Sequence, residues 1–132
     1  MARVLLVEDE ASVLIFAEIV LQGLGYSTLS AGSQTDALAL FNDPGGVDLL
    51  LTDIRLPDSD LGGFELAQEA RDRNPSLKVL YTTGEIVSDR MKVLYVDGAK
   101  MLPKPYTDVE LEDAIRTLIG ANERPCQAED NR

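Results

Sequence analysis

Short runs of β-branched residues and leucine alternate with stretches of helical periodicity along the chain. The clearest run is Leu49-Leu50-Leu51, three consecutive leucines that favour a strand buried on both faces. Strands that alternate with helices form a parallel sheet, because each helix carries the chain back across the sheet. Five strands are predicted, over residues 3–7, 26–30, 48–52, 78–83 and 99–102. The predicted fold class is α/β, with a single doubly wound five-stranded parallel sheet.

Helical periodicity predicts five helices, one after each strand. The first presents one apolar face, made of Val13, Phe16, Ala17, Val20, Leu21 and Leu24. Three more are predicted over residues 34–41, 64–73 and 88–95. Thr107 and Glu110 have the spacing of a capping box, so the last helix begins there and ends at Gly120. We expect one domain over residues 1–120 and a polar, disordered tail over residues 121–132.

Composition excludes several classes of chemistry. The chain contains no histidine, which rules out histidine bases, Ser–His–Asp triads and imidazole metal ligands within it. Its net charge of −11 disfavours nucleic acid and anionic membranes as partners. Cys126 is the only cysteine, so no intramolecular disulfide can form, and no signal-peptide pattern is visible. A cytoplasmic location is expected.

Charged and hydroxyl side chains follow the predicted strands. Glu8 and Asp9 follow the first strand, Asp53 the third, Thr83 lies at the end of the fourth, and Lys104 follows the fifth. Each residue alone is more typical of a turn, a helix cap, a strand or a surface charge. Together they would meet beyond the carboxyl ends of one sheet, where ligands collect. Clustered carboxylates favour Mg²⁺, and an added hydroxyl and ammonium suit a phosphoryl group, for which an aspartate can be the acceptor.

Four motifs in the chain resemble the receiver domain of two-component response regulators. They are Leu5-Leu6-Val7-Glu8-Asp9-Glu10, Leu51-Thr52-Asp53-Ile54-Arg55-Leu56-Pro57, Tyr81-Thr82-Thr83-Gly84 and Leu102-Pro103-Lys104-Pro105-Tyr106. Their order and spacing match the family, and the resemblance spans about residues 2–120. It implies a flavodoxin-like (βα)5 fold with strand order 2-1-3-4-5, an order carried over from the family.

The resemblance also implies a metal site. Asp9 matches the direct Mg²⁺ ligand, and Asp53 matches the phosphoacceptor that shares the metal. The backbone carbonyl of Arg55 matches the group that completes the site. Glu8 stands where most receiver domains have aspartate, a residue that usually acts on the metal through water.

Further positions match groups that handle the phosphoryl group. Thr83 matches the hydroxyl that moves onto the phosphoryl group, Gly84 a small residue whose N–H helps, and Lys104 its cation. The Lys104–Pro105 bond is often cis in this family. Met101 departs from the family, which commonly carries tyrosine or phenylalanine there.

The implied partner is a sensor histidine kinase or a histidine phosphotransfer protein, whose phosphohistidine supplies the phosphoryl group to Asp53. The chain is then a signalling domain rather than an enzyme, and its output goes through protein contact. Ile15 and Ile19 lie on the helix face opposite the core. They are either ordinary exposed apolar residues or a contact patch for the partner. A homodimer through the face formed by Ser88–Leu118 is a further hypothesis.

Two other function classes are alternatives. A haloacid-dehalogenase-type phosphatase also forms an aspartyl phosphate, but it needs a general acid two residues after the nucleophile. Arg55 holds that position and cannot donate a proton at neutral pH. A flavodoxin-like cofactor binder is disfavoured because the loop after the first strand is acidic. Arg55 and Glu85 follow neighbouring strands, so we expect them to form an ion pair or to remain two separately solvated side chains.

Overall fold

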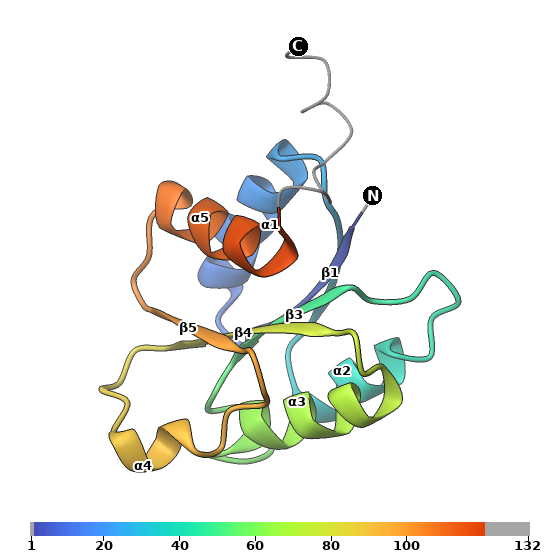
Figure 1. Cartoon of the computed structure of the whole chain (residues 1–132). Helices are drawn as coiled ribbons and strands as arrows, with labels where there is room; N and C mark the ends of the chain where they lie inside the picture. The colour runs from blue at the N-terminus through green and yellow to red at the C-terminus, as the bar shows by residue number, and fades with distance from the viewer. Residues whose placement is uncertain (1, 121–132) are drawn as a thin grey trace.

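A computed structural model describes residues 2–120, which form one sheet of five parallel strands. The strand order is β2-β1-β3-β4-β5, which confirms the order expected from the family (Figure 1). The strands are β1 (Arg3–Val7), β2 (Ser27–Ala31), β3 (Leu49–Asp53), β4 (Lys78–Thr83) and β5 (Lys100–Pro103). All five residues of β3 are buried, as the run of leucines predicted for a central strand.

The helices form a layer on each face of the sheet (Figure 1). Helices α1 (Ala11–Gly23) and α5 (Asp108–Ile119) cover one face. Helices α2 (Gln34–Leu40), α3 (Gly62–Arg73) and α4 (Asp89–Lys92) lie on the other. Alternate residues of each strand point to opposite faces, so the strands contribute to two separate apolar cores. This three-layer arrangement leaves the carboxyl ends of the strands facing outward along one edge.

Helix ends are fixed by the capping box that the sequence predicted and by further side chains that it did not predict. Thr107 and Glu110 form the predicted capping box at the start of α5. Ser33 caps α2 by accepting a hydrogen bond from the Asp36 amide. Asp58, in the loop after β3, also accepts hydrogen bonds from the first amides of α2. This contact ties the loop that follows Asp53 to a helix on the same face.

The structure corrects several details of the prediction. Strands β2, β3 and β5 each begin and end one residue later than predicted, and α3 begins two residues earlier. The predicted helix over residues 88–95 is only the four-residue α4, none of whose residues is buried, so tertiary packing does not extend it. Phe16 was placed on the core face of α1, but it is 38% exposed and lies near the ring of Tyr106 instead.

One prediction lies outside the described residues: the disordered tail, with Cys126, falls in residues 121–132.

The Lys104–Pro105 peptide bond is cis, as expected from the family. Within residues 2–120, none of the helices combines the length and the apolar character needed to cross a bilayer.

Gly63 brings α3 into direct contact with the end of β3. Its amide donates a 2.8 Å hydrogen bond to the carbonyl oxygen of Ile54. A Cβ atom at this position would overlap the carbonyl oxygen of Asp53 and lie 2.8 Å from the Cα atom of Ile54. These are backbone atoms that cannot move aside alone, so only glycine allows this approach.

We expect Gly63→Ala to destabilise the protein by about 1–3 kcal/mol, because the added methyl group must push α3 away from β3. Urea unfolding of the two proteins measures the difference. Gly23→Ala is the matched control, because a Cβ atom there has open space around it. That variant should be neutral or stabilised by up to about 1 kcal/mol. Equal stability of Gly63→Ala and wild type would contradict the close approach.

Candidate functional site

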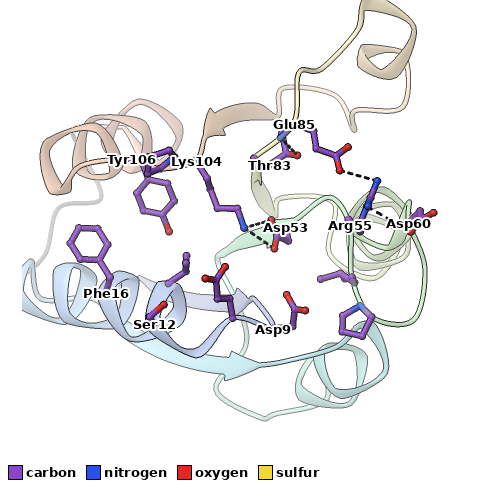
Figure 2. A pocket seen from close by; sticks show the side chains of 16 residues that line it. Asp9, Ser12, Phe16, Asp53, Arg55, Asp60, Thr83, Glu85, Lys104 and Tyr106 are labelled. Carbon is purple, nitrogen blue, oxygen red and sulfur yellow. Dashed lines mark hydrogen bonds and ion pairs between the residues drawn. The ribbon is translucent and has the colours of Figure 1, made fainter.

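An open cavity of about 1000 Å³ lies at the carboxyl edge of the sheet. Side chains from the ends of β1, β3, β4 and β5 surround it (Figure 2). The sheet is parallel, so residues far apart in the sequence meet at this edge. The predicted site residues that line the cavity are Asp9, Asp53, Arg55, Thr83, Gly84 and Lys104. The remaining one, Glu8, contacts Lys104 from beside the cavity.

Lys104 connects the acidic residues of two strands. Its Nζ atom lies 3.0 Å from each carboxylate oxygen of Asp53 and 3.1 Å from Oε1 of Glu8. The side chain of Lys104 is 18% exposed, so these ion pairs are largely shielded from water. Burial alone would lower the pKa of Lys104, but the hydrogen bond and charge of Asp53, together with Glu8, raise it overall. Lys104 is therefore charged at neutral pH.

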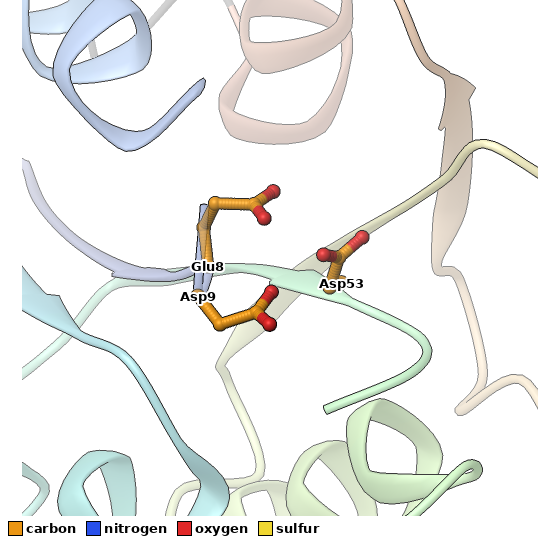
Figure 3. Close-up of side chains that lie close together, drawn as sticks. All are labelled: Glu8, Asp9 and Asp53. Carbon is orange, nitrogen blue, oxygen red and sulfur yellow. The ribbon is translucent and has the colours of Figure 1, made fainter. Parts of the chain in front are cut away.

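Three carboxylates converge beside this ammonium group. Glu8, Asp9 and Asp53 each place an oxygen within 4.8 Å of the others (Figure 3). Glu8 and Asp53 are buried, whereas Asp9 is exposed. Burial, followed by the negative charge of Asp53, raises the pKa of Glu8 to about 7. The backbone amide of Glu10 donates to the second oxygen of Glu8 and opposes that shift.

Two adjacent threonines at the end of β4 make different contacts. The hydroxyl oxygen of Thr83 accepts a 3.1 Å hydrogen bond from the amide of Glu85 and leaves its own proton free to donate. Thr82 is buried and donates a 3.3 Å hydrogen bond to Oδ1 of Asp53. Sequence reasoning treated Thr82 only as a strand residue and missed this contact. Only the register between β3 and β4, which the sequence does not reveal, places Thr82 beside Asp53.

Arg55 and Glu85 form the expected ion pair, with Nη2 of Arg55 2.9 Å from Oε2 of Glu85. Asp60 lies farther away, 3.7 Å from Nε of Arg55. The Arg55 side chain is 62% exposed, so the pair lies at the rim of the cavity (Figure 2). It links the loops that follow β3 and β4.

One wall of the cavity is apolar. Val13 and Phe16 of α1 and Tyr106 after β5 line it, and the rings of Phe16 and Tyr106 have centroids 6.1 Å apart. Burial and the nearby charge of Glu8 raise the pKa of Tyr106 to about 12. The tyrosine is therefore neutral at physiological pH. Sequence reasoning gave no role to Phe16 or Tyr106 in this cavity.

Met101 lies on the neighbouring part of β5, in register with Tyr81 of β4. It is half-buried against the core below α3 and α4. Tyr81 packs against Tyr95, with ring centroids 4.9 Å apart, and against Phe64 at 5.1 Å. The aromatic rings near this position therefore come from α3, from β4 and from the segment after α4.

The family model of the response regulator receiver domain matches residues 4–116. This chain is a response regulator receiver domain. The match confirms the resemblance that the four motifs carried.

Related receiver sequences occur within longer proteins. The domain is 32% identical over 120 residues to sensor kinase CckA of Brucella abortus; the match covers 89% of this chain and 12% of that kinase. It is 31% identical to the transcriptional regulatory protein CpxR of Klebsiella pneumoniae, with 90% of this chain and 50% of CpxR covered. The receiver domain thus spans an eighth to a half of these two relatives.

Solved receiver structures have the same fold. A response regulator receiver protein from Sinorhizobium medicae superposes with a TM-score of 0.82 at 27% identity, covering 92% of this chain and 97% of that one. A receiver domain protein from Clostridium thermocellum gives 0.78 at 29% identity, covering 90% and 94%. These comparisons confirm the fold class expected from the sequence.

We expect Glu8 to stabilise the metal-free receiver domain more strongly in acid. The folded protein holds the Glu8 proton up to about pH 7, whereas the unfolded chain releases it near 4.5. The folded state binds more protons between these values, so this contribution is complete below 4.5 and is lost as the pH rises through about 7. Urea unfolding in EDTA from about pH 5 to about pH 8 measures the effect.

Glu8→Gln is the control for this measurement, because its side chain does not titrate. The difference between the urea midpoints of wild type and variant should favour wild type most at the acidic end and shrink toward the alkaline end. A difference that stays constant with pH would show that Glu8 does not titrate in this range.

Proposed function

We propose that this receiver domain accepts a phosphoryl group on Asp53 from a phosphohistidine of a partner protein. The main support is the contact of Lys104 with both oxygens of Asp53 inside an open cavity. This arrangement places the buried carboxylate of Asp53 next to a cation that suits phosphoryl oxygens. Signalling by protein contact would follow, without a multiple-turnover reaction.

The acidic cluster fits a Mg²⁺ ion. Its donors are oxygens only, from Glu8, Asp9 and Asp53, and hard oxygen ligands are what Mg²⁺ takes. Asp9 and Asp53 would hold the ion with the backbone carbonyl of Arg55, and Glu8 would contact it through a water molecule. Bound there, Mg²⁺ would neutralise charge on the phosphoryl oxygens.

Residues of the chain itself would carry out the transfer. A carboxylate oxygen of Asp53 attacks phosphorus, and the P–O bond forms as the P–N bond to the donor imidazole breaks. The electron pair of that bond stays on the imidazole nitrogen. Lys104 would then pair with a phosphoryl oxygen, and the free hydroxyl proton of Thr83 would be donated to another. The exposed amide of Gly84 lies at the same cavity.

The phosphohistidine donor would belong to a sensor histidine kinase or a histidine phosphotransfer protein. Ile15 and Ile19, 52% and 66% exposed on α1, would form part of the contact with it. The exposed Val93 and Val109 lie within the Ser88–Leu118 face, for which a homodimer remains a prediction. Nucleic acid and membrane surfaces are not proposed as partners, because of the net charge of −11. The cytoplasm is the proposed compartment.

The phosphatase alternative receives no support from the site. Arg55 stands where the second acid of a haloacid-dehalogenase-type enzyme would lie, and its guanidinium is engaged with Glu85. The chain matches the receiver family over residues 4–116. We therefore propose no second function.

We expect incubation with acetyl phosphate and Mg²⁺ to add one phosphoryl group, detected by intact mass. Asp53→Ala should gain none, because the acceptor oxygen is gone. Asp60→Ala is the control, since Asp60 lines the same cavity but is exposed and contacts Arg55 instead. Phosphorylation of Asp53→Ala to the wild-type level would disprove the assignment. Mg²⁺ should also raise the urea midpoint of wild type and not that of Asp53→Ala.

We expect the Arg55–Glu85 pair to slow hydrolysis of the phosphorylated domain by partly covering the phosphoryl group. Because both side chains are exposed, Arg55→Ala or Glu85→Ala should speed dephosphorylation by no more than about fivefold. The double variant should be no faster than either single one. Lifetimes followed by intact mass measure these rates.

The exposed Arg73–Glu69 pair on α3, with the same 2.9 Å separation, provides the control. Arg73→Ala and Glu69→Ala should leave the lifetime unchanged. Strictly additive effects of Arg55→Ala and Glu85→Ala on the logarithm of the rate would mean that the pair does not act as a gate.

A further inference from the structure

Thr82 lies beside the acceptor aspartate on the side away from Thr83. It is the register partner of Asp53 across β3 and β4. Side chains alternate along a strand, so Thr82 faces the α1 and α5 side with Leu80, whereas Tyr81 and Thr83 face the other side. Thr82 is 3% exposed, and its hydroxyl donates to Oδ1 of Asp53 at 3.3 Å.

We propose that the Thr82 hydroxyl shortens the lifetime of the phosphorylated receiver domain by stabilising the carboxylate of Asp53 as a leaving group. The inference rests on the proposed phosphorylation of Asp53. It assigns Thr82 as a positioning residue: the hydroxyl holds Oδ1 and leaves Oδ2 to carry the phosphoryl group.

The chemistry of hydrolysis explains the direction of the effect. Water attacks phosphorus, the bond between phosphorus and Oδ2 breaks, and its electron pair returns to the carboxylate. Both hydrogens of the water leave with inorganic phosphate. During this step Oδ1 changes from the uncharged carbonyl oxygen of an acyl phosphate into part of a carboxylate anion. A hydroxyl donates a stronger hydrogen bond to an anion than to a neutral carbonyl, so Thr82 favours the hydrolysed state.

The same hydrogen bond holds back the forward reaction slightly. It stabilises the carboxylate before it attacks, so its removal should leave phosphoryl uptake undiminished while slowing phosphoryl loss. General damage to the site would instead impair both. The bond is longer than the 2.7–2.8 Å typical of hydroxyl donors, which limits its effect to about three- to tenfold in rate.

Four variants test the inference. Thr82→Val removes the hydroxyl and keeps the shape of the side chain. Thr82→Ala also removes the hydroxyl, and its smaller side chain cannot clash with its neighbours. Thr82→Ser retains the hydroxyl. Thr52→Val is the matched control, because Thr52 is also buried in the sheet but donates to the backbone oxygen of Asp53 rather than to its carboxylate.

Each protein is phosphorylated with acetyl phosphate and Mg²⁺, freed of the donor, and followed by intact mass. We expect lifetimes about three- to tenfold longer for Thr82→Val and Thr82→Ala, with uptake at least as fast as that of wild type. Thr82→Ser and Thr52→Val should keep the wild-type lifetime.

Unchanged lifetimes in Thr82→Val and Thr82→Ala, or equal lengthening in Thr52→Val, would overturn the inference and leave the proposed function intact. Slower uptake together with a shorter lifetime would also overturn it. If wild type took up no phosphoryl group, the proposed function would fail, and the role of Thr82 would fail with it.

Discussion

The parallel direction of all five strands determines where the chemistry of this domain lies. Each strand ends at the same edge, so polar residues that follow different strands meet there. Glu8, Asp53, Thr83 and Lys104 come from four strands and gather around one cavity in this way. The apolar cores on the two faces of the sheet hold the strands in register, and the register fixes which side chains face one another.

Clustering carboxylate side chains at this edge is electrostatically unfavourable, and Lys104 offsets this cost. Two buried carboxylates would repel each other in the absence of a cation, and the pKa of Glu8 is raised first by burial and then by the charge of Asp53. Lys104 lies between them and contacts both. The ammonium thus performs two tasks: it permits the carboxylates to be buried in the metal-free state, and in the proposed function it meets the phosphoryl oxygens. A group that stabilises the resting site is the same group that the reaction would use.

The sequence predicted the parts of the site that depend on strand ends. Asp53 and Lys104 follow clear apolar runs, so their convergence could be inferred from chain order alone, and the Arg55–Glu85 pair followed from the same logic. Thr82 could not be recognised, because a threonine inside a strand is ordinary and only the register with Asp53 gives it a partner. Helical periodicity also misplaced Phe16, which lies near Tyr106 at the cavity wall rather than in the core. Periodicity alone does not show which apolar residues of α1 the rest of the protein covers. Helix α4 is shorter than predicted because few tertiary contacts stabilise it.

The contact between Lys104 and Glu8 joins residues that are 96 positions apart. On a ribosome, Glu8 and Asp53 both emerge well before Lys104, and β1 can pair with β3 while β5 is still unmade. Both carboxylates therefore precede their ammonium partner in synthesis, and their ion pairs with it can form only once the chain has been made through β5.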